Sequence, residues 1–153
     1  MSYDPDIENI ITQFIGKTQR LISLLKDEGD NFRENNLTQI ELLAHKKNEV
    51  QVELAKLLDA LQALPFLAGY QGSIHQKLSA YAAGLTGQSM RAMQGLLAQM
   101  QASVVECEHL MTINKQVIRH NQNYLQNLCS TLIHHHVKTD AVTYGKTGEL
   151  QHL

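Results

Sequence analysis

Histidine and cysteine are the residue types in this chain that could hold a metal ion or act in catalysis. The 153 residues include eight histidines and two cysteines. Helical bundles can hold two metal ions when Glu-x-x-His pairs on different helices face one another. Glu106 and His109 have this spacing, but they fall on the outward side of the helix predicted around them, and Glu149 and His152 lie in the C-terminal tail. We therefore predict no metal site and no cofactor.

The two cysteines, Cys107 and Cys129, are predicted to be reduced thiols without a catalytic role. They stand 22 residues apart on one predicted helix, roughly 33 Å at 1.5 Å per residue, so they cannot form a disulfide within one chain. A reduced cysteine buried on a helix is far commoner than a nucleophile. The chain also lacks a phosphate-binding glycine loop and the GxSxG, HExxH and CxxC motifs. We predict that the protein is not an enzyme.

Three consecutive histidines, His134, His135 and His136, permit two interpretations. Such a tract can bind a transition metal adventitiously. In the last turn of a helix, histidines also interact favourably with the free carbonyls and the negative end of the helix dipole. The second role is the one we favour.

The element that must position these residues is a stretch from about Gln88 to His136. Its apolar residues recur in alternating steps of three and four from Met90 to Leu132, and neither Pro nor Gly follows Gly95 within it. This period predicts one helix of roughly 45 residues, on the order of 70 Å long. A helix of this length needs other helices or a partner chain to bury its apolar stripe.

Two earlier stripes have the same spacing and predict helices over residues 5–33 and 37–64. Asp4 can cap the first helix while Pro5 occupies its first turn. The short connection between the two helices requires an antiparallel hairpin. Lys47 occupies a seam position of the second stripe, and we interpret it as a snorkelling lysine that sets the register.

The composition agrees with an all-α class, because aromatic residues make up only 5% of the chain and Trp is absent. We predict an elongated antiparallel three-helix bundle or coiled coil over residues 1–137, with no strand. An additional short helix from Ile74 to about Ala83, capped by Ser73, is predicted between glycine pairs. Residues 138–153 are predicted to form a flexible tail.

The charge is small overall but unevenly distributed. A net charge of −2 gives no electrostatic reason to expect nucleic acid as a partner. Residues 1–64 carry 7 Lys/Arg against 11 Asp/Glu, and residues 65–153 carry 6 against 4. The two halves could attract each other, although we favour a solvated acidic face. We find no signal peptide and no bilayer-spanning apolar run, and we expect a cytoplasmic protein without stable membrane insertion.

The remaining candidate for function is a binding surface on the long helix. Four of the five methionines lie between Met90 and Met111. Methionine-rich faces adapt to helical partners, but Met93 and Met100 are predicted to fill the core instead. Beyond Asn114 the long helix should project past the first two helices, which leaves an exposed apolar stripe for a partner helix. That stripe consists of Ile118, Leu125, Leu128 and Leu132.

At this point the order of several weak motifs resembles the FlgN family of flagellar export chaperones. These motifs are Lys47 followed by Val50, Leu54 and Leu57, a late helix with Leu110, Ile113 and Asn114, and a tail with Thr143, Tyr144, Gly145 and Gly148. The resemblance covers most of the chain.

The resemblance implies a cytoplasmic, non-enzymatic chaperone of flagellar type III export. Members bind the C-terminal segments of hook-filament junction proteins of the FlgK and FlgL type, prevent premature assembly and deliver them to the export gate and the ATPase complex. The late helix binds the cargo, which by position implies a site formed by Leu110, Ile113, Asn114, Val117, Ile118, Asn121, Leu125, Leu128 and Leu132. The tail docks to the export gate, which implies a role for Tyr144 and Gly145.

A different class of function stays open, namely a self-associating structural coiled coil or adaptor without chaperone activity. Such a protein should be a stable oligomer in the absence of cargo. The mass of the protein in solution would distinguish the two.

Overall fold

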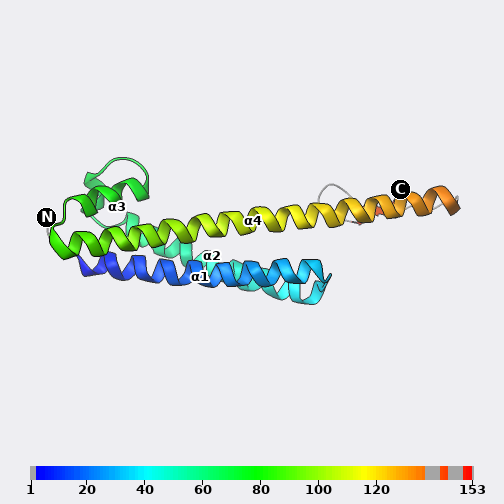
Figure 1. The fold of residues 1–153 in the computed structure, drawn as a ribbon, viewed down its shortest axis with the longest axis horizontal. Helices are drawn as coiled ribbons and strands as arrows, with labels where there is room; N and C mark the ends of the chain where they lie inside the picture. Colours follow the sequence, from blue (N-terminus) through cyan, green and yellow to red (C-terminus); the bar gives the residue numbers. More distant parts are fainter. Residues whose placement is uncertain (1–2, 137–141, 145–149, 153) are drawn as a thin grey trace. The chain divides into compact units, whose positions relative to one another are not determined.

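The computed structural model of the protein describes residues 3–136, 142–144 and 150–152. In chain order the elements are α1 (Pro5–Arg33), α2 (Leu37–Gln62), the 3-10 helix η1 (Leu67–Gly69), α3 (Ile74–Ala83), α4 (Gly87–His136), β1 (Val142–Tyr144) and β2 (Leu150–His152) (Figure 1). The all-α prediction is confirmed. The three principal helices begin and end within two residues of the predicted positions.

The tail differs from the expectation of no strand. β1 and β2 pair antiparallel, with Thr143 opposite Gln151, so that expectation is wrong for these two short segments. The β-branched Val142 and Thr143 followed by Tyr144 suit an extended backbone, but three residues are too few to show a period in the sequence. The predicted flexibility of residues 137–141, 145–149 and 153 lies outside the described residues.

The chain divides into two compact units, Met1–Met111 and Thr112–Leu153, and α4 contributes to both. The first unit contains α1, α2, η1, α3 and the first half of α4. The predicted limit of the helical domain at residue 137 stays a prediction.

The start of α1 is fixed by local capping and by one contact from a distant segment. The Asp6 backbone N–H donates to Asp4 Oδ1 at 2.8 Å, and Pro5 occupies the first turn, as predicted. The Asp4 backbone N–H donates to the hydroxyl of the buried Tyr81 of α3, also at 2.8 Å. This hydrogen bond ties the beginning of the chain to the short helix.

Helix α3 begins with the predicted Ser73 cap, and the structure adds a complete capping box. The Gln76 N–H donates to Ser73 Oγ at 3.2 Å, and the Ser73 N–H donates to Gln76 Oε1 at 2.9 Å. Gly72 precedes the cap with a φ of +107°, where a side chain would be strained and would overlap Gln76. The glycine is therefore what allows Gln76 to fold back over the helix start.

The first of two core clusters, which we call the proximal core, joins the beginning of α1 to every other helix of the first unit. Met93 and Met100 of α4 are both buried in it, as predicted. The proximal core consists of Ile7, Ile11, Ile15, Leu61, Leu67, Leu78, Tyr81, Ala82, Leu85, Met93, Leu97 and Met100.

The second cluster, the distal core, joins the end of α1 to the beginning of α2 and to α4. Its α4 member is Cys107, and Leu110 and Met111 pack against it partly buried. The distal core consists of Leu21, Ile22, Leu24, Leu25, Leu43, Val50 and Cys107. Helices α1 and α2 lie side by side through both cores (Figure 1).

Two ion pairs connect α1 and α2 and show that they run antiparallel. Lys17 Nζ lies 2.6 Å from Glu53 Oε2, and Lys47 Nζ lies 2.5 Å from Glu28 Oε2. The partner number falls as the α1 number rises, as an antiparallel hairpin requires. The Glu28 side chain is only 7% exposed and that of Lys47 is 23% exposed. The pair supports the interpretation of Lys47 as a register residue, because a buried carboxylate is costly unless a cation meets it.

We predict that Lys47→Ala destabilises the fold, because it removes the cation that faces a buried carboxylate. The cost should be about 1–3 kcal/mol, or roughly 3–10 °C in the thermal midpoint at about 2–4 °C per kcal/mol for a chain of this size. The matched control is Lys17→Ala, whose ion pair is about half exposed and should contribute less than about 1 kcal/mol. Thermal unfolding followed by circular dichroism measures both. Equal losses in the two variants would contradict the role of Lys47.

Candidate partner-binding surface on the long helix

The apolar stripe of α4 is longer than the helices available to cover it. Helix α4 has 50 residues, whereas α1 has 29 and α2 has 26. Neither can cover the whole stripe at 1.5 Å per residue. Among the described residues, the two cores include or contact α4 only as far as Met111.

The predicted cargo-binding residues from 110 to 121 differ in how far they are buried. Leu110 packs against the distal core. Asn114 is 5% exposed, which makes it one of the few buried polar residues described. The other four, which are only partly buried, are Ile113, Val117, Ile118 and Asn121. This part of α4 therefore presents partly exposed apolar side chains beside one buried amide.

The later members of the predicted site are placed by their backbone only. Leu125, Leu128 and Leu132 lie within α4, and their spacing from Ile118 puts them on one face of the helix. Their side chains lie outside the described part of the structure. Tyr144 belongs to β1 and pairs with Leu150 of β2, while Gly145 lies outside the described residues.

Cys107 is positioned for packing and not for nucleophilic chemistry. Its thiol donates to the Thr18 carbonyl of α1, with 3.7 Å between Sγ and the oxygen. Burial raises the pKa of the Cys107 thiol, and the negative charges of Glu106 and Glu108 raise it further. The thiol is therefore kept protonated at neutral pH, which is the opposite of what a nucleophile requires.

The residues with di-metal spacing point away from the core, as predicted. Glu106 and His109 are both exposed, and Glu106 Oε1 lies 3.6 Å from Lys26 Nζ of α1. Within the described ranges, no group of three His, Cys, Asp or Glu side chains could hold a metal ion. The side chains of His134, His135 and His136 lie outside those ranges, so their capping role stays a prediction.

The described ion pairs do not join an acidic half of the chain to a basic half. Lys17–Glu53 and Glu28–Lys47 both lie within residues 1–64. The pair that crosses between the halves, Lys26–Glu106, takes its cation from the acidic half. The described pairs thus give no support to the idea of two mutually attracted halves.

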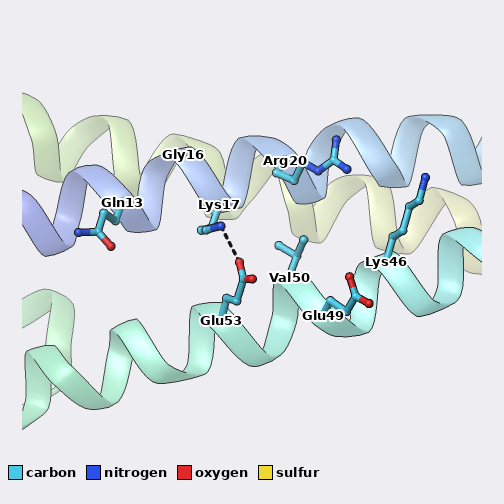
Figure 2. Close-up of a pocket in the computed structure, with 8 residues that line it drawn as sticks. All are labelled: Gln13, Gly16, Lys17, Arg20, Lys46, Glu49, Val50 and Glu53. Carbon is cyan, nitrogen blue, oxygen red and sulfur yellow. Dashed lines mark ion pairs between the residues drawn. The ribbon is translucent and has the colours of Figure 1, made fainter.

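A hollow of about 520 Å³ lies between α1 and α2 and is lined mainly by charged residues. Figure 2 shows Lys17 reaching from α1 toward Glu53 of α2, with the Val50 side chain directed toward α1. Three cations and two carboxylates share the hollow, so no single sign of charge dominates it. The lining residues are Gln13, Gly16, Lys17, Arg20, Lys46, Glu49, Val50 and Glu53.

A second hollow, which we call the apolar groove, has a volume of about 460 Å³ and is lined by residues from all four α-helices of the first unit. It is mostly apolar, and none of the predicted cargo-binding residues lines it. The lining residues are Phe14, Leu58, Leu61, Ile74, His75, Leu78, Met100, Gln101, Val104, Val105 and Glu108. The sequence did not reveal this groove, because it exists only where α3 packs beside α2 and α4.

Comparison with known protein families decides the relationship of the chain. Residues 1–152 match the family model described as FlgN protein. The chain belongs to the FlgN family. No curated protein and no solved structure gives a significant match.

Membership of the FlgN family gives the chain the general role of a flagellar export chaperone. The proteins of this family are chaperones and not enzymes. A search of the described residues finds no helix with the length and apolar character needed to cross a membrane.

We predict that iodoacetamide alkylates Cys129 faster than Cys107 in the native FlgN-family chain. Cys129 is partly exposed, whereas Cys107 is buried. Because the pKa of Cys107 is raised, its thiolate should appear only above the pH at which an ordinary thiol ionises, near 8.5. Mass spectrometry of peptides after timed alkylation at pH 7.5 and 9 measures both rates. Faster reaction of Cys107 at pH 7.5 would contradict its assignment as a packing residue.

Proposed function

We propose that this FlgN-family chain binds the C-terminal segments of hook-filament junction proteins along α4, from Leu110 to Leu132. The family match over residues 1–152 carries this proposal. Cargo of the FlgK and FlgL type would be held unpolymerised in the cytoplasm. It would then be passed to the export gate and its ATPase complex.

The form of α4 supports a helix-in-groove mode of cargo binding. Ile113, Val117 and Ile118 are partly exposed and repeat at the spacing with which helices pack. Their partial exposure gives a cargo helix apolar area to cover without unfolding the bundle. A surface of this kind binds with moderate affinity when the cargo segment must become ordered. Moderate affinity suits a chaperone that has to release its cargo.

Asparagine in this stripe supplies specificity that leucine could not. Asn121 is partly buried at a seam position, where a polar side chain fixes register between paired helices at a cost in stability. Leu125, Leu128 and Leu132 would then supply most of the binding energy, because buried apolar anchors dominate such interfaces.

We propose that the tail acts in delivery, with Tyr144 and Gly145 docking to the export gate. A tyrosine has a large apolar face and a hydroxyl that can remain hydrated at the rim of a partner pocket. The neighbouring glycine keeps the segment adaptable, which lowers affinity through the ordering cost. Weak docking is what a repeated delivery cycle requires.

The cargo site is tested with the double variant Leu125→Ala/Leu128→Ala. Removing two apolar anchors should weaken binding of a junction-protein C-terminal segment by roughly tenfold or more, with little change in the thermal midpoint. The matched control is Leu42→Ala/Val52→Ala, which truncates two exposed apolar residues of α2 and should leave binding unchanged. Pull-down after co-expression, followed by calorimetric titration, gives the affinities.

Two results would contradict this assignment. A fall of ten degrees or more in the thermal midpoint of Leu125→Ala/Leu128→Ala would show that these leucines are core residues. A stable oligomer of the wild-type chain that binds no junction protein would favour the structural coiled coil instead.

The delivery role is tested with Tyr144→Ala beside Tyr144→Phe. Loss of the ring should reduce binding to the export-gate protein and slow secretion while cargo affinity stays the same, and the phenylalanine variant should retain most gate binding. Surface-immobilised gate protein and a secretion assay measure the two effects. Loss of cargo affinity with gate binding intact would refute the proposal.

A further inference from the structure

The apolar groove has the composition of a docking site that is separate from the cargo stripe. Eight of its eleven lining residues are apolar. Its base reaches the proximal core, where Leu61 is 1% and Leu78 is 0% exposed. At its edge Val105 is 56% exposed, the second-highest value among the exposed large apolar residues described. Solvent therefore meets a hollow that is continuous with the core, and exposed apolar surface of this kind marks interaction sites.

The groove has a sharper chemical character than the charged hollow between α1 and α2. Glu108 is the only acidic residue that lines it, and no lysine or arginine does. Lys17, Arg20 and Lys46 line the other hollow, and Lys17 already pairs with Glu53. A partner of the groove would therefore meet apolar surface and one carboxylate.

The walls of the groove are helices, which determines the shape of partner that fits. Residues spaced three and four apart on α4, including Gln101, Val104, Val105 and Glu108, form one side. Rows of side chains at this spacing leave channels that receive the ridge of another helix. A volume of about 460 Å³ holds several aliphatic or aromatic side chains from such a ridge.

We propose that the apolar groove binds an amphipathic helix of a partner protein, with bulky apolar residues on one face and a lysine or arginine placed to meet Glu108. The apolar anchors would enter between α2, α3 and α4, and the basic residue would pair with the carboxylate at the edge. This site is independent of the proposed cargo stripe, because every lining residue precedes Met111. The chain could hold cargo on one surface and a second protein on another.

The probes for this proposal are two synthetic amphipathic helical peptides with the same leucine face. One carries lysines beside that face and the other carries glutamates. Fluorescence anisotropy of labelled peptide should show that the wild-type chain binds the lysine peptide at least roughly fivefold more tightly, since opposite charge at an interface selects the partner. Failure of the lysine peptide to bind at millimolar concentration would overturn the proposal.

Two matched pairs of variants locate the binding. Val105→Arg should weaken the lysine peptide by roughly tenfold, whereas Val52→Arg, at another exposed valine that does not line the groove, should change it less than about twofold. Glu108→Lys should reverse the preference between the two peptides, and Glu41→Lys on the exposed surface of α2 should not. Circular dichroism confirms that each variant is folded.

Three results would overturn the proposal. Equal losses in Val105→Arg and Val52→Arg would place the binding elsewhere. An unchanged peptide preference in Glu108→Lys would remove the charge component. If Val105→Arg dissolved a dimer of the wild-type chain, measured by analytical ultracentrifugation, the groove would be an interface between two copies.

Discussion

The burial of one stripe of α1 is the constraint on which the rest of the first unit depends. Ile7 and Ile11 hold the proximal core and Leu25 holds the distal core, each at no more than 1% exposure. Truncating one such residue to alanine typically costs 2–5 kcal/mol, a large share of a domain stability of roughly 5–15 kcal/mol. Because α1 contacts α2 in both cores, the hairpin and the docking of α4 form one cooperative arrangement.

Polar residues interrupt this stripe without breaking it, since each finds a partner. The Thr18 hydroxyl donates to the Phe14 carbonyl at 2.8 Å, and the Thr18 carbonyl in turn accepts the Cys107 thiol. Glu28 meets Lys47. These contacts act at single positions along the seam, so they favour one register of the helices over others that would bury similar apolar area.

The sequence was sufficient for the helices because their signals are local and long. The 3,4 repeat, the Asp4–Pro5 start and the Ser73 cap each act within a few residues, and the structure has all of them. The apolar groove and the partner of Lys47 could not be predicted, because they depend on which helix faces lie against each other. The cargo stripe was proposed from period and length, and α4 has both.

Hydrogen–deuterium exchange with and without a junction-protein C-terminal segment tests the central claim most directly. The account predicts slower exchange in α4 from residue 113 to 132 when cargo is bound, because covering the stripe suppresses local opening of that helix. Exchange in α1, which is already buried in both cores, should not change. Protection confined to residues before Met111, with residues 113–132 unaffected, would contradict the assignment of α4 as the cargo surface.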